Sequence, residues 1–389
     1  MRKRSTRARR CPICHEPMIK SGKTAAGSQR WKCTSCRASS TAPRSDQSAL
    51  TIFTTFLSYL AGKLFQAEIS GNTGRGLRRR WAWCWTVPTP AIEITGEIYD
   101  QLFIDGIYLP YNWCLLVAHN GAHVVARQWC RRENSAAYTA LLSQIPPPDL
   151  VTTDGHGGAA KALKQLWPQV PVQRCLVHVH RNNLRDLTSR PNTPAGKALL
   201  ELSRRLLKVT TKEEAATWVK LLIEFNTEYG SYLKERTYAH DVPPSQRRSN
   251  QKWWYTHERD RRVYRRLASL HGKGHLFAFL EFDTPRHKTT NPVESFNNCL
   301  RSVLLYHRGL SQAHMITAID WYCYTHCEFP RSSREILTQW EKAGRPARRL
   351  IPKKKQQPAP SSDEPQRYGT ALSAEEGLWT RKGWAGCSK

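Results

Sequence analysis

The chain lacks any apolar stretch long enough to cross a membrane: its 389 residues contain no uninterrupted apolar run of about 18. Its arginine-rich N-terminus is not followed by the apolar segment of a secretory signal. Twelve cysteines in a chain of this length also do not make a small secreted disulfide scaffold. These absences predict a protein that is neither membrane-embedded nor exported and that acts in a reducing cytoplasm.

Acidic residues are scarce as well, with 31 Asp and Glu against 60 Lys and Arg, a formal net charge of +29. An excess of positive charge of this size indicates an anionic partner, and the usual large polyanion is nucleic acid. An anionic membrane surface is the competing partner, but the missing apolar run disfavours it. We therefore expect a DNA partner and no membrane, in a chain long enough for two or three domains.

Residues 1–44 contain two Cys-x-x-Cys pairs, Cys11 with Cys14 and Cys33 with Cys36, separated by eighteen residues. Two such pairs suit a tetrahedral zinc ion with four thiolate ligands. The segment is too short to bury a core, so the metal would supply its folding energy. The many flanking basic residues predict a zinc ribbon that contacts phosphate; the alternative is a purely structural ribbon.

Residues 45–90 have the pattern of three helices. Apolar residues at helical spacing predict one helix from Asp46 to Gly62 and a short one at 65–69. A turn at 71–73 then leads into a third, basic helix at 73–85. This order predicts a helix-turn-helix DNA-binding domain, and the alternative is a linker with solvated arginines. The candidate DNA-binding residues of the third helix are Arg75, Arg78, Arg79 and Arg80.

Residues 91–190 alternate between strands and helices, which indicates an α/β domain. Three strands in succession, then two strands that alternate with helices, predict a mixed sheet with antiparallel strands first and parallel strands after. The expected strands are 101–109, 113–119, 123–129, 150–154 and 170–176, and the expected helices are 134–143, 158–167 and 179–187.

Two aspartates of this domain stand out. Asp105 lies among apolar residues of the first strand, where an ionised carboxylate is costly unless it is paired or binds a metal. The alternative is a hairpin turn at Asp105-Gly106. Asp154 ends the fourth strand, and functional groups gather at such carboxyl ends. The first and fourth strands are neighbours when a right-handed crossover follows a three-stranded meander.

Residues 191–284 are predicted to be helical throughout, as an insertion, with Thr211 and Glu214 at capping-box spacing. Trp253 and Trp254 precede a basic helix; they either stack on bases or, as we favour, pack in the core. The candidate DNA-binding residues of that helix are Arg259, Arg262, Arg265 and Arg266.

Residues 285–345 are predicted to form two further helices after the insertion. Asn291 is expected to cap a helix that runs to about residue 306, with Pro292 at its first position and Glu294 in its first turn. A final helix is expected at 312–327, and 346–389 is predicted to be a basic, disordered tail. Asp105, Asp154 and Glu294 together suffice to hold two divalent ions, which would clamp a phosphodiester; Glu294 alone could instead complement the helix dipole.

Four segments now suggest a family: FIDG around Asp105, TTDG around Asp154, QRCLVHVHRN at 173–182, and TNPVESFNN around Glu294. Over roughly residues 1–330 their order and spacing resemble the mutator-like group of bacterial insertion-sequence transposases. The resemblance implies an RNase H-like catalytic core of DDE type, interrupted by the helical insertion. It implies that Asp105, Asp154 and Glu294 bind Mg²⁺ or Mn²⁺, and that His178, in a Cys-x-x-His element with Cys175, lies in the active site.

The activity implied by this resemblance is binding to the ends of an insertion sequence, followed by metal-dependent DNA cleavage and strand transfer. By analogy, a homodimer would hold the two ends together, in the nucleoid of a bacterial cytoplasm. One alternative is a zinc-ribbon and helix-turn-helix DNA-binding regulator with a degenerate nuclease core, against which the three intact acids argue. The other is a nuclease or resolvase that cuts without joining.

Overall fold

The computed structural model describes residues 10–345, except 12, 26–28, 42–48, 72–73 and 249. The chain divides into two compact units, which are treated separately below. The first comprises Met1–Glu93, Tyr108–Asn112 and Phe296–Lys389, and the second Ile94–Ile107 and Trp113–Ser295. The predicted tail at 346–389 and the predicted helix start at Asp46 lie outside the described residues.

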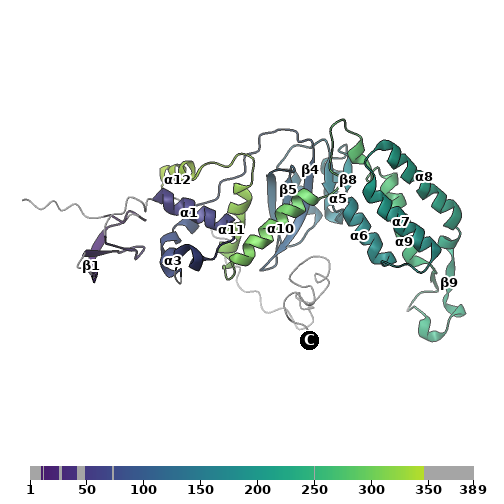
Figure 1. Cartoon of the computed structure of the whole chain (residues 1–389), viewed down its shortest axis with the longest axis horizontal. Coiled ribbons are helices and arrows are strands. Elements are labelled where there is room, and N and C mark those ends of the chain that lie inside the picture. Colours follow the sequence, from purple (N-terminus) through teal and green to yellow (C-terminus); the bar gives the residue numbers. More distant parts are fainter. Residues whose placement is uncertain are drawn as a thin grey trace, which may run out of the picture. The chain divides into compact units, whose positions relative to one another are not determined.

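The second unit is built on a five-stranded mixed sheet with the order β6-β5-β4-β7-β8 (Figure 1). Its strands are β4 (Leu102–Leu109), β5 (Trp113–His119), β6 (Val124–Cys130), β7 (Val151–Thr153) and β8 (Val172–Arg174). The pair β5–β6 is antiparallel, whereas β4–β7 and β7–β8 are parallel. The α/β class, the mixed sheet and the adjacency of its first and fourth strands are confirmed.

Helices of the second unit pack on this sheet and on one another. The first three are α4 (Ser135–Leu142), α5 (Gly157–Leu166) and α6 (Leu176–Leu187). Asn134 caps α4 by accepting a hydrogen bond from the Ala137 N–H at 2.9 Å, as its residue type favours. The helix α6 begins three residues earlier than expected, and β8 is correspondingly shorter. Cys175 therefore lies at a helix N-terminus and not within a strand.

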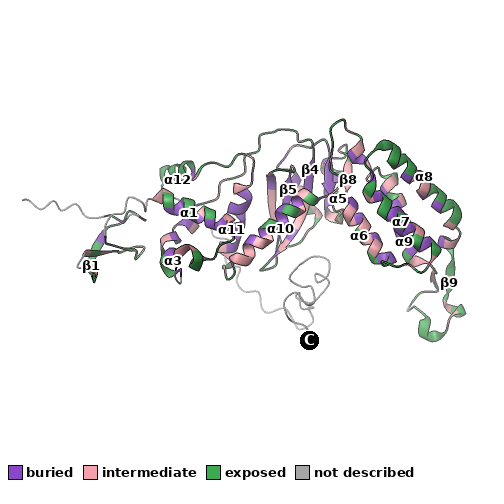
Figure 2. Cartoon of the chain, viewed as in Figure 1, coloured by how far each residue is buried: buried purple, intermediate pink, exposed green. Residues whose placement is uncertain are grey.

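The insertion forms a helical bundle around a leucine-rich core. Its long helices are α7 (Pro194–Lys208), α8 (Lys212–Tyr229) and α9 (Glu258–Gly272). The capping box of Thr211 and Glu214 is confirmed, since each backbone N–H donates to the other residue's side chain. Figure 2 shows the outer face of α8 exposed, while Trp218 and Leu222 on its other face are buried in the shared core.

The prediction that the insertion is wholly helical was wrong. The strands β9 (Arg236–Tyr238) and β10 (Trp253–Tyr255) form an antiparallel hairpin. Short 3-10 helices accompany it, namely η2 (Tyr232–Lys234), η3 (Ala239–Asp241), η4 (Pro244–Gln246) and, after α9, η5 (Ala278–Leu280). Core packing was also the wrong expectation for Trp253, which is 38% exposed. The Arg236 guanidinium stacks on its ring at 4.1 Å, a cation–π contact that suits a hairpin surface.

The first unit is mainly helical. It contains α1 (Ala49–Ala61), α2 (Gln66–Ser70), α3 (Arg75–Trp81), η1 (Cys84–Thr86), α11 (Gln312–Thr325) and α12 (Ser333–Lys342), and α10 (Asn291–Tyr306) enters it from the second unit. The third helix ends at Trp81, four residues earlier than predicted. Its tryptophan and those that follow turn into the core: Trp81 stacks on Tyr59 at 4.7 Å, and Trp83 stacks on Trp340 at 5.6 Å.

A small antiparallel sheet at the start of the first unit carries the cysteine pairs. Its strands are β1 (Met18–Lys23), β2 (Gln29–Cys33) and β3 (Ser39–Ser40), in that order. Across the described residues of both units, the helices are either too short or too polar to cross a membrane.

Candidate active site

Asp105 and Asp154 lie at adjacent positions of the sheet. The parallel register of β4 and β7 pairs Ile104 with Thr153. The next residue in each segment is an aspartate: Asp105 continues β4, and Asp154 directly follows the last residue of β7. Asp105 is half-buried, with Phe103 and Ile104 before it in the core. The adjacency of the two strands leaves the acids close enough for the charge of Asp154 to raise the pKa of Asp105.

The turn after β7 fixes the orientation of Asp154. The Asp154 Oδ1 accepts a hydrogen bond from the His156 N–H at 2.8 Å, and the Arg174 guanidinium donates to the Asp154 carbonyl at 2.5 Å. Gly155 between them has φ +90°, and a Cβ at this position would overlap the Arg174 guanidinium. Only glycine adopts this positive φ readily and leaves the Cβ position empty for Arg174, so the turn depends on it.

Glu294 enters the site from the first turn of α10. This helix begins at Asn291, so the expected cap at Asn291 was wrong by one residue: Thr290 precedes the helix, and its carbonyl accepts from the Glu294 N–H at 3.0 Å. The Thr290 hydroxyl in turn donates to Glu294 Oε1. The Glu294 side chain is 24% exposed, so it remains accessible to a ligand.

Two buried glutamines, which the sequence analysis missed, hold the chain where it returns from the insertion. Gln173 in β8 donates to the Leu276 carbonyl at 3.0 Å and accepts from the Phe279 N–H at 3.2 Å. Gln101, just before β4, donates to the His287 carbonyl at 2.7 Å and accepts from the His287 N–H at 2.8 Å. A buried amide that satisfies both a donor and an acceptor of another segment fixes that segment strongly. The approach of α10 to the sheet is thereby set.

His178 and Cys175 come from the N-terminus of α6 and lie beside Glu294. The His178 Nδ1 is 3.6 Å from Glu294 Oε1, and the Arg181 Nη1 is 3.9 Å from Glu294 Oε2. The neighbouring Cys175 sulfur, against the opposing effect of burial, raises the pKa of His178 to about 9. Burial raises the pKa of the Cys175 thiol, but His178 and Thr290 together lower it by more. The two side chains thus shift each other's pKa in opposite directions, His178 upward and Cys175 downward.

A fourth acid, Glu133, was not predicted as part of the site. Its Oε2 accepts a hydrogen bond from the Tyr138 hydroxyl at 2.6 Å and lies 3.9 Å from His156 Nδ1. Burial, followed by the charges of Asp154 and Glu133, raises the pKa of Asp105 to about 8. Glu133 stands in the polar segment Arg131-Arg132-Glu133-Asn134, so only its proximity to Asp105 in space reveals it.

Two groups of side chains bring potential metal-ligand atoms within 4.8 Å of one another in the described residues. They are the four N-terminal cysteines and the trio Cys175, His178 and Glu294. The three acids Asp105, Asp154 and Glu294 do not form such a group.

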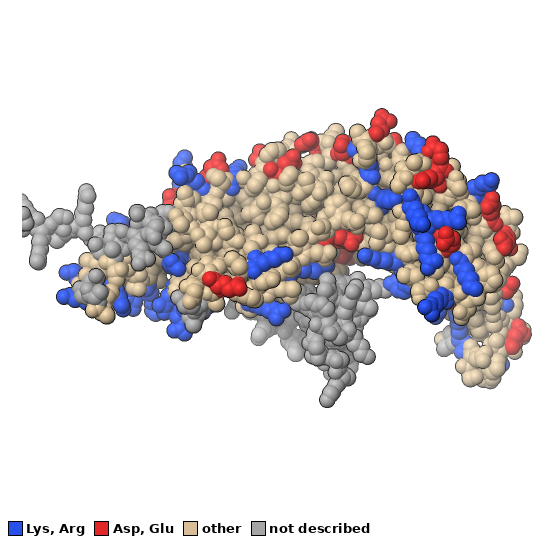
Figure 3. All heavy atoms as spheres, in the orientation of Figure 1, with Lys and Arg blue, Asp and Glu red and all other residues tan. Residues whose placement is uncertain are grey.

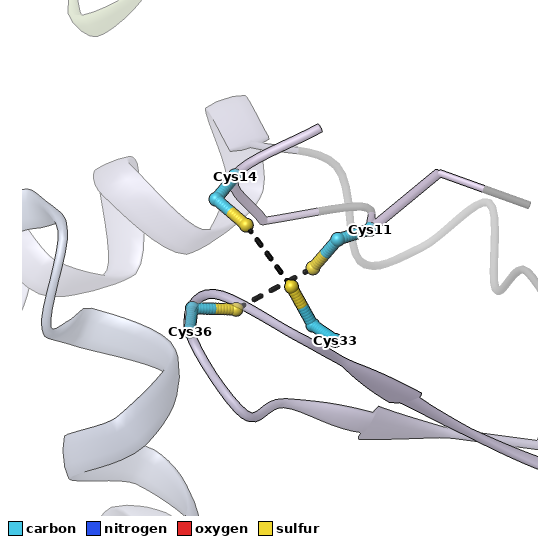
Figure 4. Close-up of side chains that lie close together, drawn as sticks. All are labelled: Cys11, Cys14, Cys33 and Cys36. Carbon is cyan, nitrogen blue, oxygen red and sulfur yellow. Dashed lines mark hydrogen bonds between the residues drawn. The ribbon is translucent and has the colours of Figure 1, made fainter. Parts of the chain in front are cut away.

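The four cysteine sulfurs face a common centre (Figure 4). The Cys11 and Cys36 sulfurs are 3.5 Å apart, and the Cys14 and Cys33 sulfurs 3.3 Å. Sulfurs about 2.3 Å from a tetrahedral zinc ion are roughly 3.8 Å apart, so a modest expansion would admit the metal.

Basic side chains surround the candidate DNA-binding elements. In the first unit, a cavity of about 570 Å³ between the cysteine-bearing sheet and α3 is lined in part by Arg30, Arg37, Arg79 and Arg80. In the second unit, lysines and arginines gather over α6, α7 and α9 (Figure 3).

The four predicted arginines of α9 differ in their contacts. Arg259 and Arg265 are exposed. Arg262 binds Asp186 at 3.1 Å, and Arg266 binds the same carboxylate at 2.5 Å. Arg262 and Arg266 therefore tie α9 to α6, whereas Arg259 and Arg265 remain directed to solvent. In α3, Arg75, Arg78 and Arg79 are exposed and Arg80 is half-buried.

Part of the sequence is similar to known proteins. Residues 124–232 match the family described as Transposase, Mutator family. Over this segment the chain is similar to the mutator family of transposases. A curated relative, the transposase for insertion sequence element IS905 of Lactococcus lactis subsp. lactis (strain IL1403), is 29% identical over 147 residues. This match covers 34% of the chain and 36% of the relative, about a third of its length.

The mutator-family match confirms the resemblance suggested by the sequence motifs. It includes Asp154, Cys175 and His178, but it ends before Glu294 and begins after Asp105. The match therefore says nothing of Asp105 and Glu294.

Proposed function

We propose that the chain is a DDE transposase, which binds the ends of its insertion sequence and catalyses metal-dependent cleavage and transfer of DNA strands. The observation that carries the proposal is the parallel register of β4 and β7, whose last pair, Ile104 and Thr153, is followed in each segment by an aspartate, Asp105 and Asp154. The strand order supports an RNase H-like core, in which the fourth strand lies beside the first. A mutator-family match across the second acid supports the same assignment.

Asp105, Asp154 and Glu294 would hold Mg²⁺ or Mn²⁺, since these cations prefer carboxylate oxygens. The donor set fits: burial and neighbouring carboxylates raise the pKa of Asp105 to about 8, so a cation would relieve the repulsion. When bound, such ions polarise a phosphodiester and activate water. Zn²⁺ would occupy the four-cysteine site and stabilise a ribbon fold.

The chain's own residues would orient the reaction. Water displaces the 3′-oxygen of the cleaved phosphodiester, and the freed 3′-hydroxyl then attacks a phosphodiester of target DNA. Asp105 lies on the central strand and Asp154 in a turn fixed by Gly155, so their carboxylates have little freedom to move. His178, protonated at neutral pH, stands near Glu294 and would stabilise negative charge that develops on the phosphate.

DNA binding would involve both units. We assign end recognition to a helix-turn-helix of α1, α2 and α3, through Arg75, Arg78, Arg79 and Arg80, together with the zinc ribbon. Exposed Arg259 and Arg265 on α9 would contact phosphate. A homodimer acting on double-stranded DNA in the bacterial cytoplasm would hold both ends during transfer.

The test uses the full chain, a labelled DNA end and Mg²⁺ or Mn²⁺. Asparagine at Asp105 or Asp154, or glutamine at Glu294, should abolish cleavage and joining while end binding survives. Asp283→Asn, at an exposed acid of the same unit, is the matched control and should cut normally. Near-normal cutting by Asp105→Asn would refute the assignment. End binding without any cleavage by the wild type would favour a DNA-binding regulator.

A further inference from the structure

The trio Cys175, His178 and Glu294 has the composition of a zinc site, although the proposed reaction needs only harder cations. Its ligand atoms lie within 4.8 Å of one another. The His178 Nδ1 and Glu294 Oε1 are 3.6 Å apart. Nitrogen and oxygen ligands about 2.0–2.1 Å from a tetrahedral ion are roughly 3.4 Å apart, so this pair is close to the required spacing.

The elements that supply the trio bring it together by backbone contacts. Cys175 and His178 are three residues apart at the start of α6, so both side chains lie on one face of its first turn. The Cys175 N–H donates to the Thr153 carbonyl at 2.9 Å, which ties α6 to the end of β7. The Leu176 N–H donates to the Lys288 carbonyl at 3.1 Å, which ties it to the segment before α10.

One buried residue, Thr290, orients two of the three potential ligands. Its N–H donates to the Cys175 sulfur at 3.3 Å, and its hydroxyl donates to Glu294 Oε1. The third ligand, His178, has a buried Nδ1 that makes no hydrogen bond in the described structure. Such outer contacts fix the ligands of metal sites. A buried nitrogen without a hydrogen bond gains a partner when a metal ion binds it and its proton is released to water.

We propose that Cys175, His178 and Glu294 bind Zn²⁺ or a similarly thiophilic divalent cation, and that this binding inhibits the Mg²⁺-dependent reaction. The inhibition rests on the proposed function, whereas the binding does not. Thiolate and imidazole ligands select zinc over magnesium. Three protein ligands with one open position are also the usual set at a solvent-accessible zinc ion.

Inhibition follows because Glu294 belongs to two sets of ligands. Its carboxylate cannot complete the hard-cation site with Asp105 and Asp154 while a zinc ion holds it beside Cys175. The chain would thus be active in a magnesium-rich, zinc-poor solution and silent when free zinc rises.

The first experiment counts zinc in the full-length protein after dialysis against buffered free Zn²⁺. The wild type should hold about two zinc ions per chain, one in the four-cysteine site and one in the trio. Cys175→Ala, His178→Gln and Glu294→Gln should each hold about one. The matched controls are Cys114→Ala, at a buried cysteine of β5, and His180→Gln, two residues along α6, and both should keep two.

About one zinc ion in the wild type overturns the proposal, as does a second ion that all three variants retain. Glu294→Gln guards against misfolding of the buried Cys175 variant, because the Glu294 side chain is 24% exposed. Cobalt substitution gives a direct signature: the wild type should gain a second thiolate-to-cobalt charge-transfer contribution that Cys175→Ala lacks. Thr290→Val should weaken binding of the second ion by about 10–100-fold, as expected when a residue that orients the ligands is replaced.

The second experiment titrates zinc into the Mg²⁺-supported cleavage assay. Wild-type cleavage should fall over the zinc range that fills the second site. In Cys175→Ala the inhibiting zinc concentration should rise by at least about 100-fold, with rates taken relative to that variant's own zinc-free rate. Unchanged cleavage with the second site filled would overturn the inhibitory role. If the wild type cleaves no DNA at all, the proposed function fails while the zinc count still decides the binding site.

Discussion

Replacing Asp105 by asparagine should stabilise the metal-free protein. Burial and the neighbouring acids Asp154 and Glu133 raise the pKa of Asp105 to about 8, whereas an unfolded aspartate titrates near about 3.9. The folded state therefore binds this proton more tightly. The stability associated with the protonated carboxyl is fully present below about pH 4 and is lost as the pH rises towards about 8.

The difference between those pKa values corresponds to roughly 5 kcal/mol at about pH 8, at 1.36 kcal/mol for each pH unit. Asp105 is only half-buried, so solvent screening reduces the expected gain to about 2–4 kcal/mol. Asparagine removes the charge and keeps the shape. For a unit of about 200 residues, each kcal/mol shifts Tm by about 2–4 °C, so Asp105→Asn should melt roughly 5–15 °C higher.

The assay follows thermal unfolding with chelator at about pH 5 and about pH 8, and hydrogen exchange in β4 assigns the transition to the sheet. The gain from Asp105→Asn should be larger at the higher pH. Saturating Mg²⁺ should raise the Tm of the wild type and not that of the variant, because ligands stabilise the state that binds them. Asp283→Asn should match the wild type throughout. If Asp105→Asn melts no higher than wild type at about pH 8, the reasoning about the buried charge is refuted.

Three further predictions concern other parts of the chain. Cys33→Ser should remove the zinc of the four-cysteine site, seen as one equivalent fewer by metal analysis; a wild type without zinc there would contradict the ribbon. Alanine at Arg78, Arg79 and Arg80 should weaken binding to the DNA ends. The slope of log affinity against log salt concentration should fall by about one for each phosphate that the variant no longer neutralises. Unchanged binding would move recognition elsewhere. Gly155→Ala should abolish cleavage and cost at least about 1–2 kcal/mol, since its φ is +90° and Arg174 fills the Cβ position. The control Gly157→Ala should change neither cleavage nor stability, because no atom lies within 4 Å of the added Cβ.

The sheet was predictable from sequence because its strands are apolar runs interrupted by clear turns. The adjacency of β4 and β7 followed from the handedness of the crossover, and it carried Asp105 and Asp154 to neighbouring positions. The boundary between β8 and α6 was not predictable, because the apolar residues near Cys175 suit a strand and a helix equally. The helix begins where the Cys175 N–H reaches the Thr153 carbonyl, an interaction that local sequence does not encode.

Other features depended on interactions between distant segments. The hairpin of β9 and β10 was missed because its strands are short and far apart in sequence. Glu133 was missed because its surroundings are polar, although it lies close enough to Asp105 to perturb its pKa. Gln101 and Gln173 looked like ordinary strand residues, and their partners lie more than 100 residues away.

Because of those two glutamines, the position of Glu294 does not depend on the length of the insertion that precedes it. Gln173 fixes the chain as it leaves α9, and Gln101 fixes it again at His287, shortly before Glu294. The cost of closing a loop grows only slowly with its length, so the insertion can be lengthened or shortened beyond these points at little energetic cost. Its outer hairpin, β9 and β10, is thus a place where sequence can be gained, deleted or exchanged while Glu294 keeps its position.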